Sequence, residues 1–106
     1  MTEPAFGTDV LGRLRHEVEV GIETRPSRDA SPHRTVIWVV VDAEDRVLIR
    51  SYRGAGARWY REATSGTPTA LVIGADVVPV AVEPATDDER VRACSFELER
   101  KYVGAR

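Results

Sequence analysis

The segment from residue 50 to residue 61 has the residue types and the spacing that can bind an anion. It reads RSYRGAGARWYR and carries four arginines and no acidic side chain, in a chain whose formal net charge is −2. Glycines let the backbone approach a ligand closely, guanidinium groups match phosphate oxygens, and the N–H groups at a helix start attract anions. The segment lacks both the P-loop lysine and the third glycine of the dinucleotide fingerprint. It predicts a phosphate site or, alternatively, a solvated strand end followed by a helix that Trp59 and Tyr60 anchor on the core.

The remaining reactive side chains give weaker signs of chemistry. Cys94 is the only cysteine, so the sequence predicts neither an internal disulfide nor a cysteine-based metal site. His16 and His33 lie far apart, without a cluster of metal ligands, and we expect no metal site. His33, next to Arg34, is interpreted either as a proton donor near a pocket or as an exposed residue at a strand start. Three carboxylates that alternate along one strand are interpreted as its solvated face: Glu17, Glu19 and Glu23.

Hydrophobic periodicity predicts the order α-β-β-β-α-β-β-α, which places the 50–61 segment between a strand and a helix. Consecutive strands joined by short turns are antiparallel, so we expect a mainly β fold of the α+β class. The predicted elements are a helix from an N-cap at Thr8 to Leu14, strands at 18–22, 34–42 and 47–52, a helix at 57–64, strands at 69–73 and 77–82, and a last helix that follows Thr86 and ends near Gly104.

Three of these elements carry more specific expectations. The second strand reads TVIWVVV over residues 35–41, so both of its faces need cover, from a helix or from a partner subunit. Pro79 predicts either an edge position for the fifth strand or an outward-facing amide at this residue. In the last helix, Thr86 and Glu89 fit a capping box. An apolar stripe on that helix is expected to pack on the sheet: Val91, Cys94, Leu98 and Tyr102.

Length and composition limit the class of protein. With 106 residues the chain predicts a single domain, residues 1–106, of which residues 1–7 form a loose tail. The 15 basic residues do not exceed the 17 acidic ones, which argues against a general nucleic-acid-coating protein. The N-terminus does not read as a signal peptide, and the longest apolar run, 36–41, is far too short to span a membrane. We therefore expect a cytoplasmic protein that engages neither nucleic acid nor membranes.

Three stretches of the chain resemble the split β-barrel superfamily, which binds flavin mononucleotide (FMN) or the deazaflavin cofactor. They are residues 34–38 (RTVIW), 47–54 (VLIRSYRG) and 58–60 (RWY), and the similarity runs from about residue 17 to residue 102. More narrowly, the chain resembles a family of small uncharacterised bacterial proteins placed beside the deazaflavin-dependent nitroreductases. It departs from those enzymes in lacking a proline soon after the Arg-Thr pair and in having Arg-Glu where they commonly have Asn-Leu.

The resemblance implies a fold, an assembly and a set of cofactor contacts. The fold is a small antiparallel split β-barrel with a short N-terminal helix, a short helix after the third strand and a C-terminal helix. The assembly is a homodimer with the cofactor near the interface. The implied cofactor contacts are Arg34, Thr35 and Val36 on the second strand, Ser51, Arg53 and Gly54 at the phosphate, and Arg58, Trp59 and Tyr60 at the start of the following helix.

Three functions remain open from the sequence. The first is a flavin- or deazaflavin-dependent oxidoreductase of unknown substrate, in which the cofactor supplies the redox chemistry. The second is a cofactor-free small-molecule-binding protein or enzyme, in which Arg34 or Arg53 orients a carboxylate or enolate. Its pocket would be lined by aromatic side chains: Trp38, Tyr52, Trp59 and Tyr60. The third is a dimeric module without a ligand.

Overall fold

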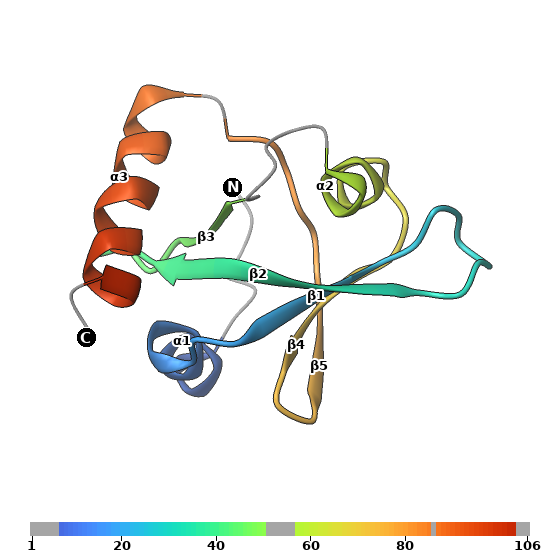
Figure 1. Cartoon of the computed structure of the whole chain (residues 1–106), viewed down its shortest axis with the longest axis horizontal. Coiled ribbons are helices and arrows are strands. Elements are labelled where there is room, and N and C mark those ends of the chain that lie inside the picture. The colour runs from blue at the N-terminus through green and yellow to red at the C-terminus, as the bar shows by residue number, and fades with distance from the viewer. Residues whose placement is uncertain (1–6, 51–56, 86, 104–106) are drawn as a thin grey trace.

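The strands and helices follow the predicted order (Figure 1). The computed structural model describes residues 7–50, 57–85 and 87–103. Within them the fold is α+β, as predicted, with a five-stranded antiparallel sheet and three α-helices. The elements are α1 (Thr8–His16), β1 (Val20–Thr24), β2 (His33–Val41), β3 (Val47–Arg50), α2 (Arg58–Ala63), β4 (Thr69–Ile73), β5 (Asp76–Val80), α3 (Asp88–Leu98) and a π-helical turn, η2 (Glu99–Val103).

The five strands form one sheet in the order β3-β2-β1-β4-β5. The central strand is β1, in which Gly21 lies opposite Val36 of β2 on one side and Val72 of β4 on the other. The edge position of β5 confirms the prediction made from Pro79, which pairs with Ala70 of β4. An edge strand tolerates proline because the missing N–H has no outer neighbour to bond.

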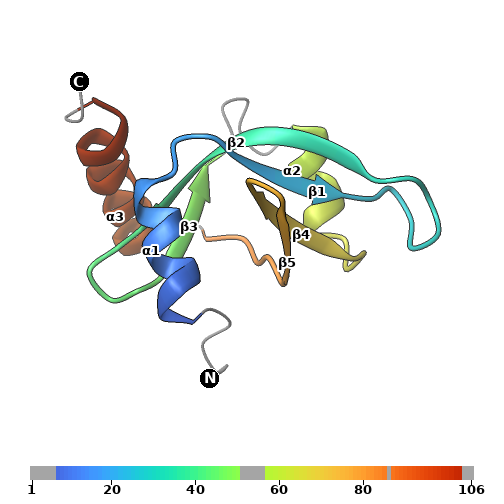
Figure 2. The same ribbon diagram turned by 90° about the horizontal axis from the view of Figure 1, so that it is seen from below.

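The main core lies between one face of the sheet and the helices α1 and α2. Leu14 of α1 and Trp59 of α2 pack there on β-branched and leucine side chains of β1, β2 and β4. Because side chains alternate between the two faces of a strand, the neighbouring residues of β2 point to the opposite face. On that face α3 packs on the end of β2 and on β3, away from α2, which lies across β1 and β2 (Figure 2). This smaller cluster consists of Val40, Leu48, Cys94 and Leu98.

Both predicted helix caps differ from the observed ones. Thr8 is the first residue of α1, and Gly7 occupies its N-cap without a side-chain bond. Asp87 is the N-cap of α3, and its carboxylate accepts a hydrogen bond from the Arg90 N–H at 3.0 Å. Thr86 itself lies outside the described residues. Aspartate and threonine satisfy the same helix donor, and the aspartate charge adds a favourable interaction with the helix N-terminus.

Four apolar residues that were expected to be covered are exposed instead. Val18 is exposed because it lies in the link between α1 and β1, at residues 17–19. Val91 is exposed on the outer side of α3. In β2, cover on both faces is present only where α3 reaches the strand. Val36 and Trp38, nearer its start, remain exposed on the face opposite the main core, at 64% and 42%. The pattern of β2 thus correctly predicts a strand but overestimates how much of it this chain buries.

The C-terminal turn is tied to the rest of the fold through Lys101 and Tyr102. The Lys101 ammonium donates hydrogen bonds to the carbonyls of Leu14 and Val39, at 2.6 and 2.8 Å. The Tyr102 hydroxyl accepts the N–H of Val39 at 3.3 Å, and the Tyr102 ring lies beside that of Trp38. One lysine therefore joins the end of α1, the middle of β2 and η2.

Replacing Lys101 by methionine is expected to remove a pH dependence of stability in the alkaline range. Burial lowers the pKa of the Lys101 ammonium to about 8, and the Glu17 carboxylate opposes the shift only in part. An unfolded lysine keeps its ordinary value of 10.5. Between these pH values the unfolded chain holds a proton that the folded chain has released, so the free energy of unfolding rises with pH.

Urea denaturation of the wild type and of Lys101→Met at a series of pH values measures this effect. The wild type is expected to gain stability relative to the variant as the pH rises from about 8 to about 10.5. A difference between the two proteins that stays constant over this range would contradict the prediction.

Candidate functional site

A buried glutamate, a buried threonine and a half-exposed histidine meet where α2 crosses the ends of β1 and β2. Thr24 and His33 are directly opposite each other in the register, so their side chains point to the same face of the sheet. The Thr24 hydroxyl donates to Oε1 of Glu62 at 2.8 Å. Nδ1 of His33 lies 3.2 Å from both carboxylate oxygens of the same glutamate. We call these three residues the Thr-His-Glu cluster.

The end of α2 holds Glu62 in place through both packing and hydrogen bonds. Trp59 and Ala63, on either side of Glu62 along the helix, are buried in the main core. The Glu62 carbonyl accepts hydrogen bonds from the hydroxyls of Ser65 and Thr67, at 2.7 and 3.0 Å. The Thr67 hydroxyl also lies 2.8 Å from the carbonyl oxygen of Arg25, the residue after β1, and this contact helps fix α2 over the β1–β2 hairpin. The carboxylate is therefore positioned by its surroundings before any ligand binds.

The pKa of the Glu62 carboxyl lies below its ordinary value, although the group is buried. Burial alone raises this pKa, but the hydrogen bonds from Thr24 and His33 and the charges of His33 and Arg58 together outweigh it. Glu62 is therefore a carboxylate at neutral pH.

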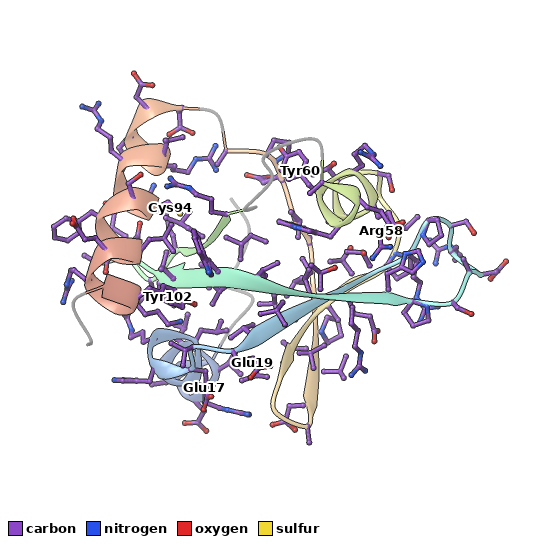
Figure 3. All side chains as sticks on the ribbon, in the orientation of Figure 1. Glu17, Glu19, Arg58, Tyr60, Cys94 and Tyr102 are labelled. Carbon is purple, nitrogen blue, oxygen red and sulfur yellow. The ribbon has the colours of Figure 1, made fainter. Side chains whose placement is uncertain are left out.

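Arg58 lies one helical turn before Glu62 and is exposed. Figure 3 shows Arg58 on the side of α2 that faces the β1–β2 hairpin, and Tyr60 on the other side of the helix. The Arg58 charge acts on the Glu62 carboxyl, which places it near the Thr-His-Glu cluster. The cluster thus has an exposed cation at its border.

This arrangement can hold a histidine ready for proton transfer. A carboxylate that accepts from Nδ1–H fixes the ring orientation and leaves the lone pair on Nε2. The His33 side chain is 37% exposed, so a ligand can reach the ring from solvent. Geometry of this kind suits a general base that becomes a general acid once protonated.

The described members of the predicted cofactor site lie on two different faces of the sheet. Arg34 and Val36 are on the face opposite the main core, and the Arg34 Nε donates to Glu23 Oε2 at 3.0 Å. Thr35 and Trp59 belong to the core side, where Trp59 is only 5% exposed. One chain therefore does not bring these four residues to a single ligand.

The other members of that prediction differ in how they are placed. Tyr60 packs edge-to-face on Trp59, with ring centroids 5.9 Å apart, and contributes to the core. Arg58 remains available at the surface. Ser51, Arg53 and Gly54 lie outside the described residues. Arg50, the first arginine of the basic segment, donates to the Val91 carbonyl at 3.0 Å and so helps hold α3.

Two of the three residues in the Thr-His-Glu cluster were missed by sequence reasoning. His33 was considered as a proton donor, whereas Thr24 and Glu62 were not singled out. Thr24 and Glu62 are 38 positions apart, and no local motif joins them. The available signal was a charged residue placed between the buried Trp59 and Ala63 in a short helix, because such a residue needs a partner when it is buried.

No group of three or more His, Cys, Asp or Glu side chains among the described residues is placed to hold a metal ion. No helix in these parts of the chain is long enough and apolar enough to cross a membrane.

The fold and the cluster define a small α+β protein with an open antiparallel sheet and a carboxylate-held histidine beneath a short helix. Comparison with family models gives a match over residues 10–105 to DUF2255, described as uncharacterized protein conserved in bacteria. The chain therefore belongs to this bacterial family, in agreement with the expected membership of a small uncharacterised one. No curated protein and no solved structure matches it.

Proposed function

We propose that this protein binds a small organic anion and transfers a proton on it, with His33 as the proton-transferring residue. The observation that carries the proposal is the 3.2 Å approach of His33 Nδ1 to both oxygens of the buried Glu62 carboxylate. Glu62 and Thr24 act as positioning residues, because Glu62 holds the ring, Thr24 holds the Glu62 carboxylate, and both side chains are buried. Arg58 is the group that would bind the anion.

The chemistry follows from the charges of the site. A neutral His33 with its proton on Nδ1 accepts a proton at Nε2, and the Glu62 carboxylate stabilises the imidazolium that forms. The guanidinium of Arg58 would bind a carboxylate of the same molecule and would stabilise an enolate formed beside it. The substrate class that fits both groups is a small oxo acid with an acidic C–H next to its carbonyl.

Proton–deuterium exchange tests this function directly. The wild type is incubated in D₂O with pyruvate or acetoacetate, and loss of the C–H signal is followed by proton NMR. His33→Gln is expected to slow the catalysed exchange by about 100-fold or more, the usual contribution of a general base. His16→Gln is the matched control, because His16 is exposed and its Nδ1 lies 2.9 Å from the Gly12 carbonyl oxygen, whereas that of His33 lies beside a carboxylate. Equal rates in the two variants would contradict the proposal.

The ring tautomer of His33 tests the positioning role of Glu62 without any substrate. Nitrogen NMR, recorded at a pH at which the His33 ring is neutral, is expected to show the ring proton on Nδ1. In Glu62→Gln the His33 signals are expected to change, while those of His16 stay the same. A His33 ring that carries its proton on Nε2 in the wild type would overturn the assignment, whatever the exchange experiment gives.

A redox cofactor is the second proposal, and it rests on the family resemblance together with the exposed Arg58. The guanidinium at the start of α2 is free to reach a phosphate of FMN or of the deazaflavin. The visible spectrum of freshly purified protein, followed by titration with each cofactor, tests it. Failure of both to bind at micromolar concentration would rule this proposal out. The expected homodimer and cytoplasmic location stay predictions.

A further inference from the structure

The sheet face opposite the main core carries an exposed apolar row across four strands. Val36, Gly21, Val72 and Val77 are consecutive partners in the register, and all four lie on this face. Val36 is 64% exposed and Val77 is 48% exposed. We call this surface, together with the row beside it, the outer face. That second row runs through Arg34, Glu23, Ala70 and Pro79.

Helix α3 covers only one corner of this side of the sheet. It packs on Val40 and Leu48, at the end of β2 and on β3. Leu14 of α1 and Trp59 of α2 belong to the main core on the opposite side. In the described part of the chain, the outer face over β1, β4 and β5 therefore has no helix upon it. A contiguous apolar surface of this kind is typical of an interaction site.

The register makes this face complementary to a copy of itself. On β2, Arg34 and Val36 lie level with Glu23 and Gly21 of β1. A two-fold rotation about an axis parallel to these strands, set between them, exchanges β1 and β2 but keeps the level of each residue. Such a rotation places Arg34 of each copy over Glu23 of the other, and Val36 of each over Gly21 of the other.

Both contacts fit in charge and in shape. Within one chain the Arg34 Nε already donates to Glu23 Oε2 at 3.0 Å, so a facing copy would bring a further opposite charge to each member of this pair, in two equivalent places as a two-fold interface requires. Gly21 leaves a depression in the row: a methyl group built on it would have only ordinary contacts, 3.5 Å from the Thr35 carbonyl oxygen and 3.6 Å from the Val72 Cβ. A valine from a facing sheet can occupy that space.

We propose that the outer face binds a second copy of this chain, with β1 of each protomer facing β2 of the other. The contact is sheet on sheet, with the apolar row in the middle and the two Arg34–Glu23 pairs beside it. It is separate from the Thr-His-Glu cluster, which lies on the other face of the same strands, so either proposal can fail without the other.

Sedimentation analysis of the full chain gives the first test. The wild type is expected to be a dimer, and Val36→Glu is expected to raise its dissociation constant by about tenfold or more, because it buries charges in the apolar centre. Phe96→Glu is the matched control: Phe96 is 61% exposed on α3 and belongs to neither row of the outer face. A monomeric wild type, or a dimer broken by Phe96→Glu and not by Val36→Glu, would overturn the proposal. If Val36→Glu does not fold, the wild type is diluted instead and the NMR chemical shifts of the Val36 and Val77 methyl groups are followed. Chemical shifts that do not change on dilution would count against this interface.

A mixing experiment tests whether the charges at positions 23 and 34 meet across the interface. Glu23→Arg alone sets arginine over arginine in its own dimer, and Arg34→Glu alone sets glutamate over glutamate, so each single variant is expected to dissociate. Mixing the two proteins is expected to restore dimers that contain one copy of each, because every facing pair is then opposite in charge. An ion pair confined to one chain would gain nothing from mixing. Failure of the mixture to associate, or unimpaired dimers of either single variant, would reject this arrangement.

Discussion

Trp59→Ala is expected to lower the free energy of unfolding by about 3 to 5 kcal/mol, the usual cost of emptying a buried aromatic site. The Trp59 side chain is 5% exposed and packs against both the sheet and Ala63 in the main core. It also supports the ring of Tyr60. Since α2 is only six residues long, it has little stability of its own, and Trp59 is its principal anchor.

Urea denaturation monitored by circular dichroism measures this loss, with Phe96→Ala as the control. Phe96 is an aromatic residue of comparable size that lies exposed beside Arg100, and its removal is expected to cost less than about 1 kcal/mol. Equal effects of the two substitutions would show that Trp59 does not anchor the core. A loss of ligand binding with unchanged stability would instead assign Trp59 to a binding site.

Asp42→Ala is expected to destabilise the fold by about 2 to 3 kcal/mol, because it removes the centre of the β2–β3 turn. The Asp42 side chain is buried, and its carboxylate accepts the N–H groups of Glu44 and Arg46, both at 2.9 Å, and the Nε–H of Arg46 at 2.6 Å. Arg46 then forms two bonds to Glu89 of α3, at 2.9 and 2.7 Å. The turn thus ties the sheet to the C-terminal helix.

The pH dependence of this effect has a definite sign. Burial raises the pKa of the Asp42 carboxyl, but the bonds from Arg46 and Glu44 outweigh it, so the pKa lies below the ordinary 3.8. The stabilising contribution is therefore complete above pH 3.8 and is lost as the pH falls through the lower folded value. Thermal unfolding of the wild type and of Asp42→Asn is expected to converge on acidification.

Glu44→Ala is the control for the turn, because Glu44 is exposed and lies 4.0 Å from Arg46. An exposed pair of this kind contributes little, so its loss is expected to cost less than about 1 kcal/mol. If Asp42→Ala costs no more than Glu44→Ala, the carboxylate does not organise the turn.

The sequence was a reliable guide wherever one local pattern decided the structure. The alternation in β1, the β-branched run of β2 and Pro79 in β5 each depend on a strand's own neighbours. The two strands and the edge position of β5 are confirmed, although β1 spans Val20–Thr24 and not residues 18–22. The exposed Val36 required knowledge of where α3 ends, which no local pattern contains. The predicted helix caps were wrong for another reason. Threonine and aspartate are both favourable at an N-cap, so the sequence does not decide between neighbouring residues of these types.

The candidate site was harder to predict because its parts lie far apart in the sequence. The family resemblance implies that Arg34, Thr35 and Val36 contact one cofactor, whereas consecutive residues of a strand point to opposite faces. The Thr-His-Glu cluster instead depends on a cross-strand pair and on a helix 29 positions beyond His33. The packing of Trp59 and Ala63, together with the hydrogen bonds at the end of α2, brings Glu62 to that pair.

The single lysine of this chain has a practical consequence for how its motions can be followed. Apart from the α-amino group, the Lys101 side chain is the only primary amine, and in the folded protein it bonds to carbonyls of α1 and β2. An amine-acylating reagent can therefore modify Lys101 only when the C-terminal turn has detached from the sheet. The rate of labelling, read by mass spectrometry on the peptide that contains Lys101, reports the opening of this end of the molecule while the rest stays folded.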